Sequence, residues 1–556
     1  MSNIIAQQLF RDGLDSFKKK KFPMSQEYFE KLLVILPSNI GVLENLALAY
    51  YFDNKFYQSE LRLKQIIKLG KKDKGIIETL LATLIRQDKI KELTRYTKEG
   101  KSIIDPKYQI SEKFITPTIP ENSEEIDYFR NQALNNLQPD KDEENIILDI
   151  DNQLIDPPGF RFSYDKYNNL KINTKIVKFL KKTYPILNKN FHFGISKNNK
   201  IKIGFISQFF SKHTIGKLFK GIIFNLDQTK FEIKVFHLHS TKKDSIFFEF
   251  LEKEKKFQLK NIILPKKFED KIKIVENEGL DIIFYPDIGM SSELYYLTFL
   301  RLAKYQLTSW GHPETTGNPN IDYFLSSSLL EVESSEKKYS EKLLLSKYLP
   351  MYFYRPSQKP INDSDISKQN IYSCPQTLIK LHPNFDEVIK KILEKDKKAK
   401  IFFIKDKNKA YYKKIINRFD KKMSIYMDRI KFLDPMSEEE YINHCGTSSV
   451  LLDPLFFGAG NSFHESMFYG TPTVSLPTNY LKSRIVLGAY KQMKVDKAPI
   501  VSSIEDYADL AVELANNDTK KILDQKKYYQ DCALNELYEN EKALLDVEDN
   551  LIKLTK

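Results

Sequence analysis

Apolar and small residues in the first hundred positions follow a helical period. The segment LFRDGLDSFKKKKFPMSQEYFEKLLVILP contains two apolar stripes at helical spacing, with a polar turn between them. Gly13 and Ala47 stand 34 positions apart, which is the period of a tetratricopeptide repeat, and a third, weaker unit begins near Gly75. We therefore expect tetratricopeptide-like helical repeats over residues 1–104, with a generic helical hairpin domain as the alternative. Repeat stacks usually offer concave surfaces to proteins or peptides.

The pattern becomes irregular between residues 105 and 195. Proline, asparagine and acidic residues accumulate in ITPTIPENSEEID, NLQPDKDEEN and DPPGF. This composition is typical of connecting segments, so we expect a linker with connecting helices over residues 105–195.

From about residue 196 onward, short apolar runs alternate with stretches of helical period. The first series occupies residues 196–355 and contains IKIGFIS, FEIKVFHLH, NIILP, DIIFYPDIG and DYFLSS. The second occupies residues 356–556, ends in helices, and contains IYSCP, KIFFIK, IKFL, SVLLDP, TVSLP and APIV. Strands that alternate with helices predict parallel sheets, so we expect an α/β protein with two doubly wound domains. Ligands of such sheets bind beyond the carboxyl ends of the strands.

Net charge adds little to this picture. A formal charge of +13 invites a nucleic-acid-binding hypothesis, but 87 basic and 74 acidic residues are interleaved along nearly the whole chain. Runs such as FKKKKF at 17–22 are better explained as solvated helix faces, so we expect no nucleic-acid partner.

Targeting and cysteine patterns restrict the compartment. No run of 18 apolar residues is present, so we expect no membrane span. The N-terminus lacks the basic flank, apolar core and cleavage site of a signal peptide. Cys374, Cys445 and Cys532 are too far apart for a zinc site or a disulfide framework. These features predict a cytoplasmic protein in a reducing compartment.

The stretch DPLFFGAGNSFHESMFYGTPTVSLP carries the strongest candidate chemistry. SVLLDP predicts a strand, LFFGAGNS a loop, and the residues from Asn461 onward a helix. Free amides and the helix dipole at Asn461 and Ser462 favour an anion such as phosphate, and Gly458 and Gly460 let it approach the backbone. A simple helix cap is the alternative. Glu465, one turn along the helix, would repel a phosphate and is better suited to hydroxyls such as those of a ribose.

Other phosphate and metal motifs are missing from the sequence. GAGNSF lacks the third glycine of a dinucleotide fingerprint, and the GKS or GKT of a P-loop does not occur. DID at 149–151 and DSD at 363–365 fall in linker-like sequence, and no His/Cys cluster has metal-ligand spacing. We therefore expect neither a metal nor a cofactor.

Five ordered segments over roughly residues 200–500 resemble one enzyme family. They are IGFISQFFSKHTIGKLFKGIIFNLDQTKFEIKVF, DIGMSSELYYLTFLRLAKYQLTSWGHPETTGNPNIDYFLSS, YSEKLLLSKYLP, CPQTLIKLHPNFDEVIKKIL and GAGNSFHESMFYGTPTVSLPTNYLKSRI. Together with the helical repeats they are similar to glycosyltransferase family 41, the tetratricopeptide-linked protein O-GlcNAc transferases and their bacterial SPINDLY-like relatives. The bacterial adhesin N-glucosyltransferases belong to the same family. The resemblance implies a GT-B fold of two Rossmann-like domains, with a UDP-sugar held mainly by the second.

The resemblance implies specific roles for residues of the second domain. Lys380 matches the lysine that meets the diphosphate, where an ammonium would neutralise the charge of the leaving UDP. Asn461 and Ser462 match the helix-start residues on the phosphates, and Glu465 matches the acidic residue on the ribose. Tyr441 falls where an aromatic ring or a histidine flanks the uracil.

In the first domain, the resemblance points to one histidine and one loop. His213 matches the family's active-site histidine, either as a base or as a positioning group, and an ordinary pKa near 6.5 would leave it mostly neutral at pH 7. His312, Thr315 and Thr316 match a loop that lines the sugar and acceptor pocket, where we expect sugar specificity to be decided. Asp165 stands where the family usually has a histidine.

These matches imply an inverting, metal-independent glycosyltransferase that moves GlcNAc or a hexose from a UDP-sugar to a polypeptide Ser or Thr hydroxyl. We expect the helical repeats to engage the polypeptide acceptor. Open alternatives are transfer to asparagine, extension of a glycan, and a repeat scaffold whose transferase half is inactive. The chain has only about three repeats and no large insert between its catalytic halves, so the acceptor range of the eukaryotic enzymes is not carried over.

Overall fold

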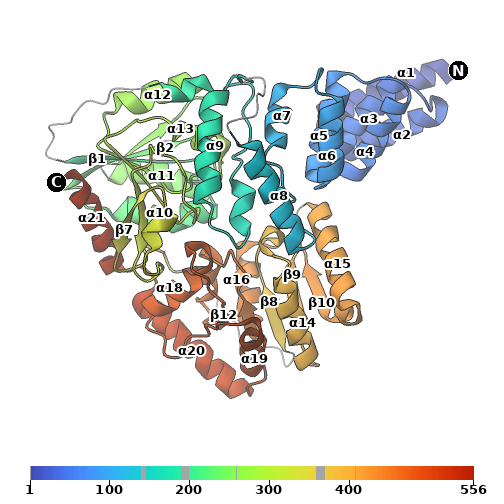
Figure 1. Ribbon diagram of the computed structural model, residues 1–556. Coiled ribbons are helices and arrows are strands. Elements are labelled where there is room, and N and C mark those ends of the chain that lie inside the picture. Colours follow the sequence, from blue (N-terminus) through green and yellow to red (C-terminus); the bar gives the residue numbers. More distant parts are fainter. Residues whose placement is uncertain (1, 139–145, 190–199, 258, 358–369, 407) are drawn as a thin grey trace. The chain divides into compact units, whose positions relative to one another are not determined.

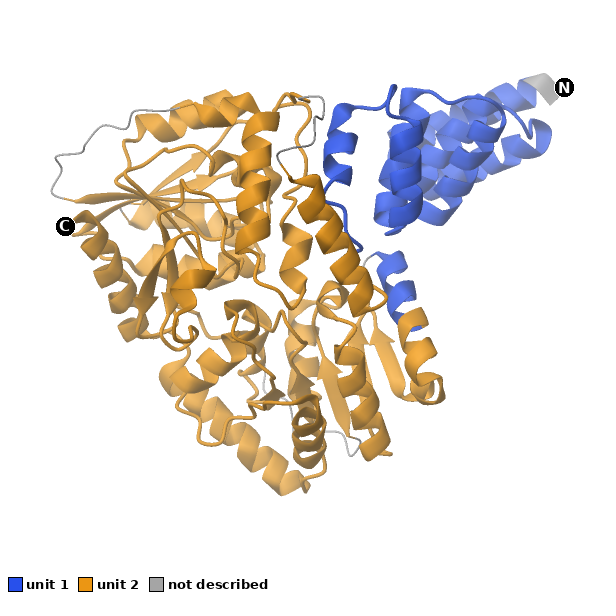
Figure 2. Ribbon diagram, viewed as in Figure 1, with its two compact units in different colours: residues 1–119, 406–416 blue, residues 120–405, 417–556 orange. Residues whose placement is uncertain are grey.

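A computed structural model of the protein (Figure 1) describes residues 2–138, 146–189, 200–257, 259–357, 370–406 and 408–556. The chain divides into two units (Figure 2): Met1–Ile119 with Asp406–Ile416, and Pro120–Lys405 with Asn417–Lys556. Lys414 ties the short second segment to the first unit, because its Nζ lies 2.7 Å from Asp88 Oδ2. Among the described residues, no helix is both long and apolar enough to cross a membrane.

Helices build the N-terminal part of the first unit. Aliphatic side chains such as Leu43, Leu46 and Leu80, each 0% exposed, form a core that runs through successive helices. The helices are α1 (Ser2–Lys18), α2 (Phe22–Ile35), α3 (Ile40–Phe52), α4 (Phe56–Lys68), α5 (Lys74–Arg86), α6 (Ile90–Glu99) and α7 (Pro106–Glu112).

One contact between these helices recurs at the period predicted from the sequence. Ser25 Oγ donates to Gly13 O at 2.9 Å and ties α2 to α1, and Ser59 Oγ donates to Ala47 O at 2.8 Å and ties α4 to α3. Gly13 has to be small, because a Cβ there would lie 2.7 Å from the ring of Phe29. The 34-residue period is therefore a structural repeat of paired helices.

A seven-stranded sheet forms the first Rossmann-like domain. Its strand order is β3-β2-β1-β4-β5-β6-β7 and all neighbours pair in parallel. Ile203, Phe205 and Ile233 are at most 1% exposed, as expected for parallel strands covered on both faces. The strands are β1 (Ile201–Ser207), β2 (Phe231–His237), β3 (Leu259–Ile263), β4 (Ile282–Tyr285), β5 (Tyr305–Ser309), β6 (Tyr323–Ser327) and β7 (Lys342–Ser346). The helices are α8 (Ser123–Asn136) and α9 (Leu170–Thr183) before the sheet, then α10 (Thr214–Asn225), α11 (Ser245–Lys256), α12 (Phe268–Asn277) and α13 (Ser292–Leu297).

A five-stranded parallel sheet forms the second Rossmann-like domain, in the order β10-β9-β8-β11-β12. Its strands are β8 (Ile371–Cys374), β9 (Lys400–Ile404), β10 (Ile430–Leu433), β11 (Val450–Leu452) and β12 (Thr473–Val474). Its helices are α14 (Phe385–Lys395), α15 (Lys409–Met423), α16 (Glu438–Thr447), α17 (Asn461–Ser466), α18 (Ile485–Gln492), α19 (Ile504–Ala515) and α20 (Thr519–Glu536).

The last helix, α21 (Glu541–Thr555), packs against the first sheet although it follows the second in sequence (Figure 1). Asn550 Nδ2 donates to Ser346 Oγ at 3.0 Å at the end of β7. Glu548 Oε1 accepts the Asp227 amide at 2.7 Å in the loop between α10 and β2. The end of the chain therefore joins the two domains.

The sheets confirm the predicted α/β architecture of a helical region followed by two Rossmann-like domains. Two strands, β5 and β7, were not among the predicted runs, and APIV forms only a bridge between Ile500 and Ser475. The finer division of the chain at residues 104, 195 and 355 stays a prediction.

Candidate active site

Both sheets reverse their strand order at one point, and the predicted residues follow the strands that meet there. The reversal lies between β1 and β4 in the first sheet and between β8 and β11 in the second. His213 follows β1, Lys380 follows β8, and Asn461 and Ser462 follow β11. In open α/β sheets, ligands bind outside the carboxyl ends of the strands at such a point. These side chains therefore stand at the edges where a ligand is expected.

The glycine-rich loop after β11 is held by a buried carboxylate. Asp453, 3% exposed, accepts the Ala459 amide on Oδ1 at 2.6 Å and the Ser475 hydroxyl on Oδ2 at 2.5 Å. Burial raises the pKa of Asp453 to about 6. A Cβ on Gly458 would lie 2.9 Å from both carboxylate oxygens, whereas a Cβ on Gly460 would meet nothing closer than 3.9 Å. Asp453 thus explains the first glycine, and only Gly460 leaves the open space that a ligand needs.

Helix α17 begins at Asn461, as the sequence predicted. The preceding residue is Gly460, so no side chain caps the helix start. Asn461 is 8% exposed, and its buried Oδ1 has no hydrogen-bond partner among the described residues. A buried polar atom without a partner is costly unless a ligand or water satisfies it. The simple-cap alternative therefore does not account for Asn461.

Gln376 connects the residues that were predicted to meet the diphosphate. Its Oε1 accepts from Lys380 Nζ at 2.9 Å, and its Nε2 donates to Ser462 Oγ at 2.6 Å. Lys380 Nζ also donates to Gly458 O at 2.8 Å and lies 5.0 Å from the centre of the Phe457 ring. Burial lowers the pKa of Lys380 to about 8, against the attraction of the nearby Asp453. The sequence analysis missed Gln376, and its only signal was a position directly after a predicted strand.

Glu465 and Tyr441 lie beside this group. Glu465 is 6% exposed, borders a cavity of about 340 Å³, and forms an ion pair with Lys217 on α10 of the first domain. Tyr441, on α16, donates its hydroxyl to Pro375 O at 3.1 Å. Burial raises the pKa of Tyr441 well above its usual value, and the side chain stays neutral at ordinary pH.

His213 is the N-cap residue of α10. Its Nδ1 accepts the Ile215 amide at 3.2 Å, and its ring stacks on Phe209 with a centroid distance of 4.3 Å. Burial, reinforced by Lys242 and Lys217, lowers the pKa of His213 to about 4. Because Nδ1 accepts a hydrogen bond, the neutral ring carries its proton on Nε2.

The predicted pocket loop is buried and internally bonded. His312, 7% exposed, forms a 3.1 Å hydrogen bond through Nε2 with Ser163 Oγ, and burial and Lys482 lower its pKa to about 4. The Thr315 hydroxyl donates to Glu341 Oε2 at 2.8 Å, and Glu341 Oε1 accepts the Thr316 amide at 2.8 Å. The threonine side chains are thus held by Glu341, and the role of this loop in sugar binding stays a prediction.

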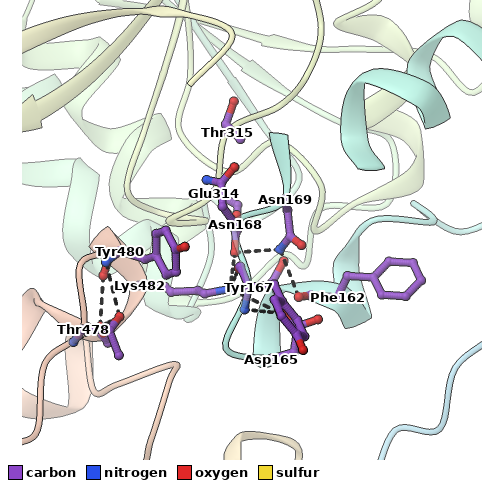
Figure 3. Close-up of polar contacts among 12 residues, drawn as sticks. Phe162, Asp165, Tyr167, Asn168, Asn169, Glu314, Thr315, Thr478, Tyr480 and Lys482 are labelled. Carbon is purple, nitrogen blue, oxygen red and sulfur yellow. Dashed lines mark hydrogen bonds and ion pairs between the residues drawn. The ribbon is translucent and has the colours of Figure 1, made fainter. Parts of the chain in front are cut away.

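A buried ionic network links this loop to the second domain (Figure 3). Lys482 Nζ lies 2.7 Å from Glu314 Oε1 and donates to Tyr167 O at 2.9 Å. Arg130 on α8 donates to Asp165 Oδ2 at 2.8 Å, and Asp165 lies 3.9 Å from the same lysine. Asp165, where a histidine was expected, therefore belongs to a charge network.

Asp287 is a second buried carboxyl group that the sequence analysis missed. It follows β4, is 0% exposed, and neither carboxylate oxygen forms a hydrogen bond with the part of the chain that the structure describes. Burial raises the pKa of Asp287 to about 7, and the neighbouring Ser207 lowers it in part. Within the described ranges, no group of three or more His, Cys, Asp or Glu side chains is arranged to hold a metal ion.

Some of the predicted residues share neighbours in the structure. Lys380 and Ser462 share Gln376 and stand at the start of α17. His312 lies next to Phe457 in the loop before α17, with ring centroids 6.4 Å apart. His213 caps α10, the helix that carries Lys217. The assignment of each side chain to a part of the donor or acceptor stays a prediction.

Comparison with protein families gives one match that covers most of the chain. The model described as Glycosyl transferase family 41 matches residues 165–361 and 363–545. The UDP-glucose:protein N-beta-glucosyltransferase of Actinobacillus pleuropneumoniae serotype 5b (strain L20) is 24% identical over 290 residues, which are 50% of this chain and 44% of that protein. The "Probable UDP-N-acetylglucosamine--peptide N-acetylglucosaminyltransferase SEC" of Arabidopsis thaliana is 21% identical over 336 residues, 58% of this chain and 34% of that protein. The chain thus spans less than half the length of these relatives.

A solved structure shares the whole fold. A mutant of Thermobaculum terrenum O-GlcNAc transferase superimposes with a TM-score of 0.70 and 14% sequence identity, and the match covers 100% of this chain and 98% of that one. The GT-B arrangement implied by the sequence is therefore confirmed.

Proposed function

This chain belongs to glycosyl transferase family 41, and from that membership we propose that it transfers a sugar from a UDP-sugar to a polypeptide. The observation that carries the proposal is the group formed by Gln376, Lys380 and Ser462 at the start of α17. It combines one cation, free helix amides and the unpartnered Oδ1 of Asn461 at the reversal point of the second sheet. Such an arrangement suits a diphosphate.

We assign the leaving-group role to Lys380. As the sugar is transferred, the bond between the anomeric carbon and the diphosphate oxygen breaks, and negative charge grows on that oxygen. A preorganised ammonium and helix amides stabilise this charge best where water is excluded. The acceptor attacks the anomeric carbon from the opposite face, forms the new bond, and releases its proton to water. This single displacement from the opposite face makes the transfer inverting. Because a cation and amide donors are already in place to stabilise the leaving diphosphate, we propose that the transfer needs no metal.

We assign His213 a positioning role. A base must accept a proton on a free nitrogen, but Nδ1 is engaged by the Ile215 amide and Nε2 carries the proton. The low pKa of His213, about 4, also makes it a weak base at neutral pH. His213 would therefore donate a hydrogen bond from Nε2 to the donor or the acceptor.

We propose a Ser or Thr hydroxyl as the acceptor, engaged by the helical repeats of α1 to α6. The second candidate is an asparagine amide, favoured by the similarity to the Actinobacillus N-glucosyltransferase. We also propose a cytoplasmic location, because Cys374, Cys445 and Cys532 are all free thiols, as is usual in a reducing compartment.

The test is a donor panel with mapping of the modified residue. The full chain is incubated with UDP-GlcNAc, UDP-glucose or GDP-fucose and a peptide library, and nucleotide release and peptide mass are measured. We expect UDP release with one UDP-sugar. Lys380→Met should lower the rate of this release by about 10²-fold or more, and the exposed control Lys413→Met should leave it unchanged. Fragmentation of the product then distinguishes a hydroxyl from an amide acceptor. No turnover of any donor, together with no UDP binding by calorimetry, would refute the proposal.

A further inference from the structure

One lysine of the first domain reaches two carboxylates of the second. Lys217, on α10, lies 2.5 Å from Glu465 Oε1 and 2.8 Å from Glu438 Oε1 through its Nζ. Glu465 lies on α17 and Glu438 at the start of α16, so the contact crosses between the domains. It links residues that are 248 positions apart in the chain.

The contact is shielded from water and borders a cavity. The side chain of Lys217 is 19% exposed and that of Glu465 is 8% exposed. The cavity beside them has Phe353, Tyr354 and Glu438 among its other lining residues. A partly desolvated ion pair with this geometry is stronger than one on an open surface.

The ion pair changes what Glu465 can do. A free carboxylate next to a diphosphate site would repel the ligand. This repulsion is stronger in a desolvated cleft than in water. Lys212, 3.5 Å from Glu438 Oε2, offsets the second carboxylate, so Lys217 offsets the charge of Glu465, which it contacts through Oε1. The carboxylate keeps Oε2 as an acceptor for two neighbouring hydroxyl groups.

We propose that Lys217 is a positioning residue of the nucleotide site, one that orients Glu465 toward the ribose diol of UDP and removes its repulsion of the diphosphate. The inference rests on the proposed function and deepens it, because the first domain then contributes to nucleotide affinity. The contact between the two domains and binding of the ribose are then coupled through one side chain.

The experiment compares UDP with 2′-deoxy-UDP by calorimetry. Lys217→Met should weaken UDP binding about tenfold to a hundredfold, the range for hydrogen bonds to charged groups. It should also reduce the preference for UDP over 2′-deoxy-UDP, because the carboxylate that reads the diol is no longer held. Lys217→Arg should restore part of both effects.

The matched control is Lys234→Met. Like Lys217, Lys234 lies between two carboxylates, Glu278 at 2.7 Å and Glu232 at 3.1 Å, but all three residues lie in the first domain. We expect Lys234→Met to bind both nucleotides as the wild type does, even if its melting temperature falls.

A double-mutant cycle separates positioning from general stability. If Lys217 acts through Glu465, Lys217→Met and Glu465→Gln will be non-additive in UDP affinity. Three outcomes would each overturn the inference: unchanged UDP affinity in Lys217→Met, equal losses of UDP affinity in Lys217→Met and Lys234→Met, or additive effects of Lys217→Met and Glu465→Gln. In each case, UDP binding by the wild type would still support the proposed function. A wild type that binds no UDP would instead remove the proposed function itself.

Discussion

At the scale of single residues, His213 caps α10, and we propose that it also positions the donor or the acceptor. Asparagine can also cap a helix, so His213→Asn should keep α10 intact while it removes the Nε2 donor. We expect a fall in kcat of about 10²-fold with nearly unchanged stability. In the wild type, kcat/KM should show no inflection near pH 6.5 from this residue, since its pKa of about 4 keeps it neutral above pH 5.

Steady-state kinetics from pH 5 to 8, together with thermal melting, check the His213 prediction. An inflection near pH 6.5 that disappears in His213→Asn would show that the ring does titrate as a base. A loss of activity that is accompanied by a lower melting temperature would mean that His213 acts only as the cap of α10.

Asp287 should make stability depend on pH. Its pKa is about 7 in the folded chain and near its usual value of 3.8 when unfolded, so only the unfolded state ionises between these values. Stability therefore falls as pH rises from about 4 to 7, by at most about 4 kcal/mol. Asp287→Asn should melt close to the wild type at pH 4.5 and at a higher temperature at pH 8.

Melting curves across this range test the Asp287 prediction, with the exposed Asp524→Asn as the control. Parallel pH dependences of wild type and Asp287→Asn would contradict it. A carboxyl group that costs stability is often retained for function, so a more stable but less active Asp287→Asn would place this group in the active site.

At the scale of elements, the second and third repeats begin their first helices, α3 and α5, with a side-chain cap. Asn39 Oδ1 accepts the Val42 amide at 3.0 Å at the start of α3, and Asp73 Oδ1 accepts the Ile76 amide at 3.0 Å at the start of α5. Asn39→Ala and Asp73→Ala should each cost about 1 kcal/mol.

Hydrogen exchange of the full chain measures this cost locally. Each variant should lose protection in its own helix and not in the two Rossmann-like domains. Lys21→Ala is the control, because no side chain caps the start of α2. Equal loss of protection in the control would show that substitution in this region, rather than the cap, causes the effect.

At the scale of the whole molecule, the network around Lys482 connects parts of the chain that are distant in sequence. Lys482→Met would leave Glu314 buried without its cation, which should cost about 3–5 kcal/mol. The double variant Lys482→Met/Glu314→Gln removes both charges and should recover much of the loss.

Denaturant unfolding of the four proteins in this cycle measures the coupling. Burial raises the pKa of Glu314 and Lys482 opposes this shift, so the coupling should weaken at low pH, where Glu314 becomes protonated. Additive single effects would mean that the two side chains act independently.

The sequence by itself determined which segments are helices and strands wherever the signal is local. The 34-residue period needed only small residues at fixed spacing, and β1 was predicted as 201–207 because isoleucine and phenylalanine dominate this short run. β5 was missed because its Gln306 looks polar. In the structure Gln306 is 0% exposed, and its side-chain Nε2 donates to Leu300 O and Asn320 O.

The sequence also predicted the helix start at Asn461, which α17 confirms, and through family resemblance it proposed Lys380 and Glu465 as site residues. It could not supply their partners. Gln376 meets Ser462 over 86 positions and Lys217 meets Glu465 over 248, and no periodic pattern encodes such distances. The protonation of His213 and Asp287 depends on burial by elements far along the chain. Only the tertiary structure decided these properties, because charge, desolvation and hydrogen bonding depend on neighbours in space rather than in sequence.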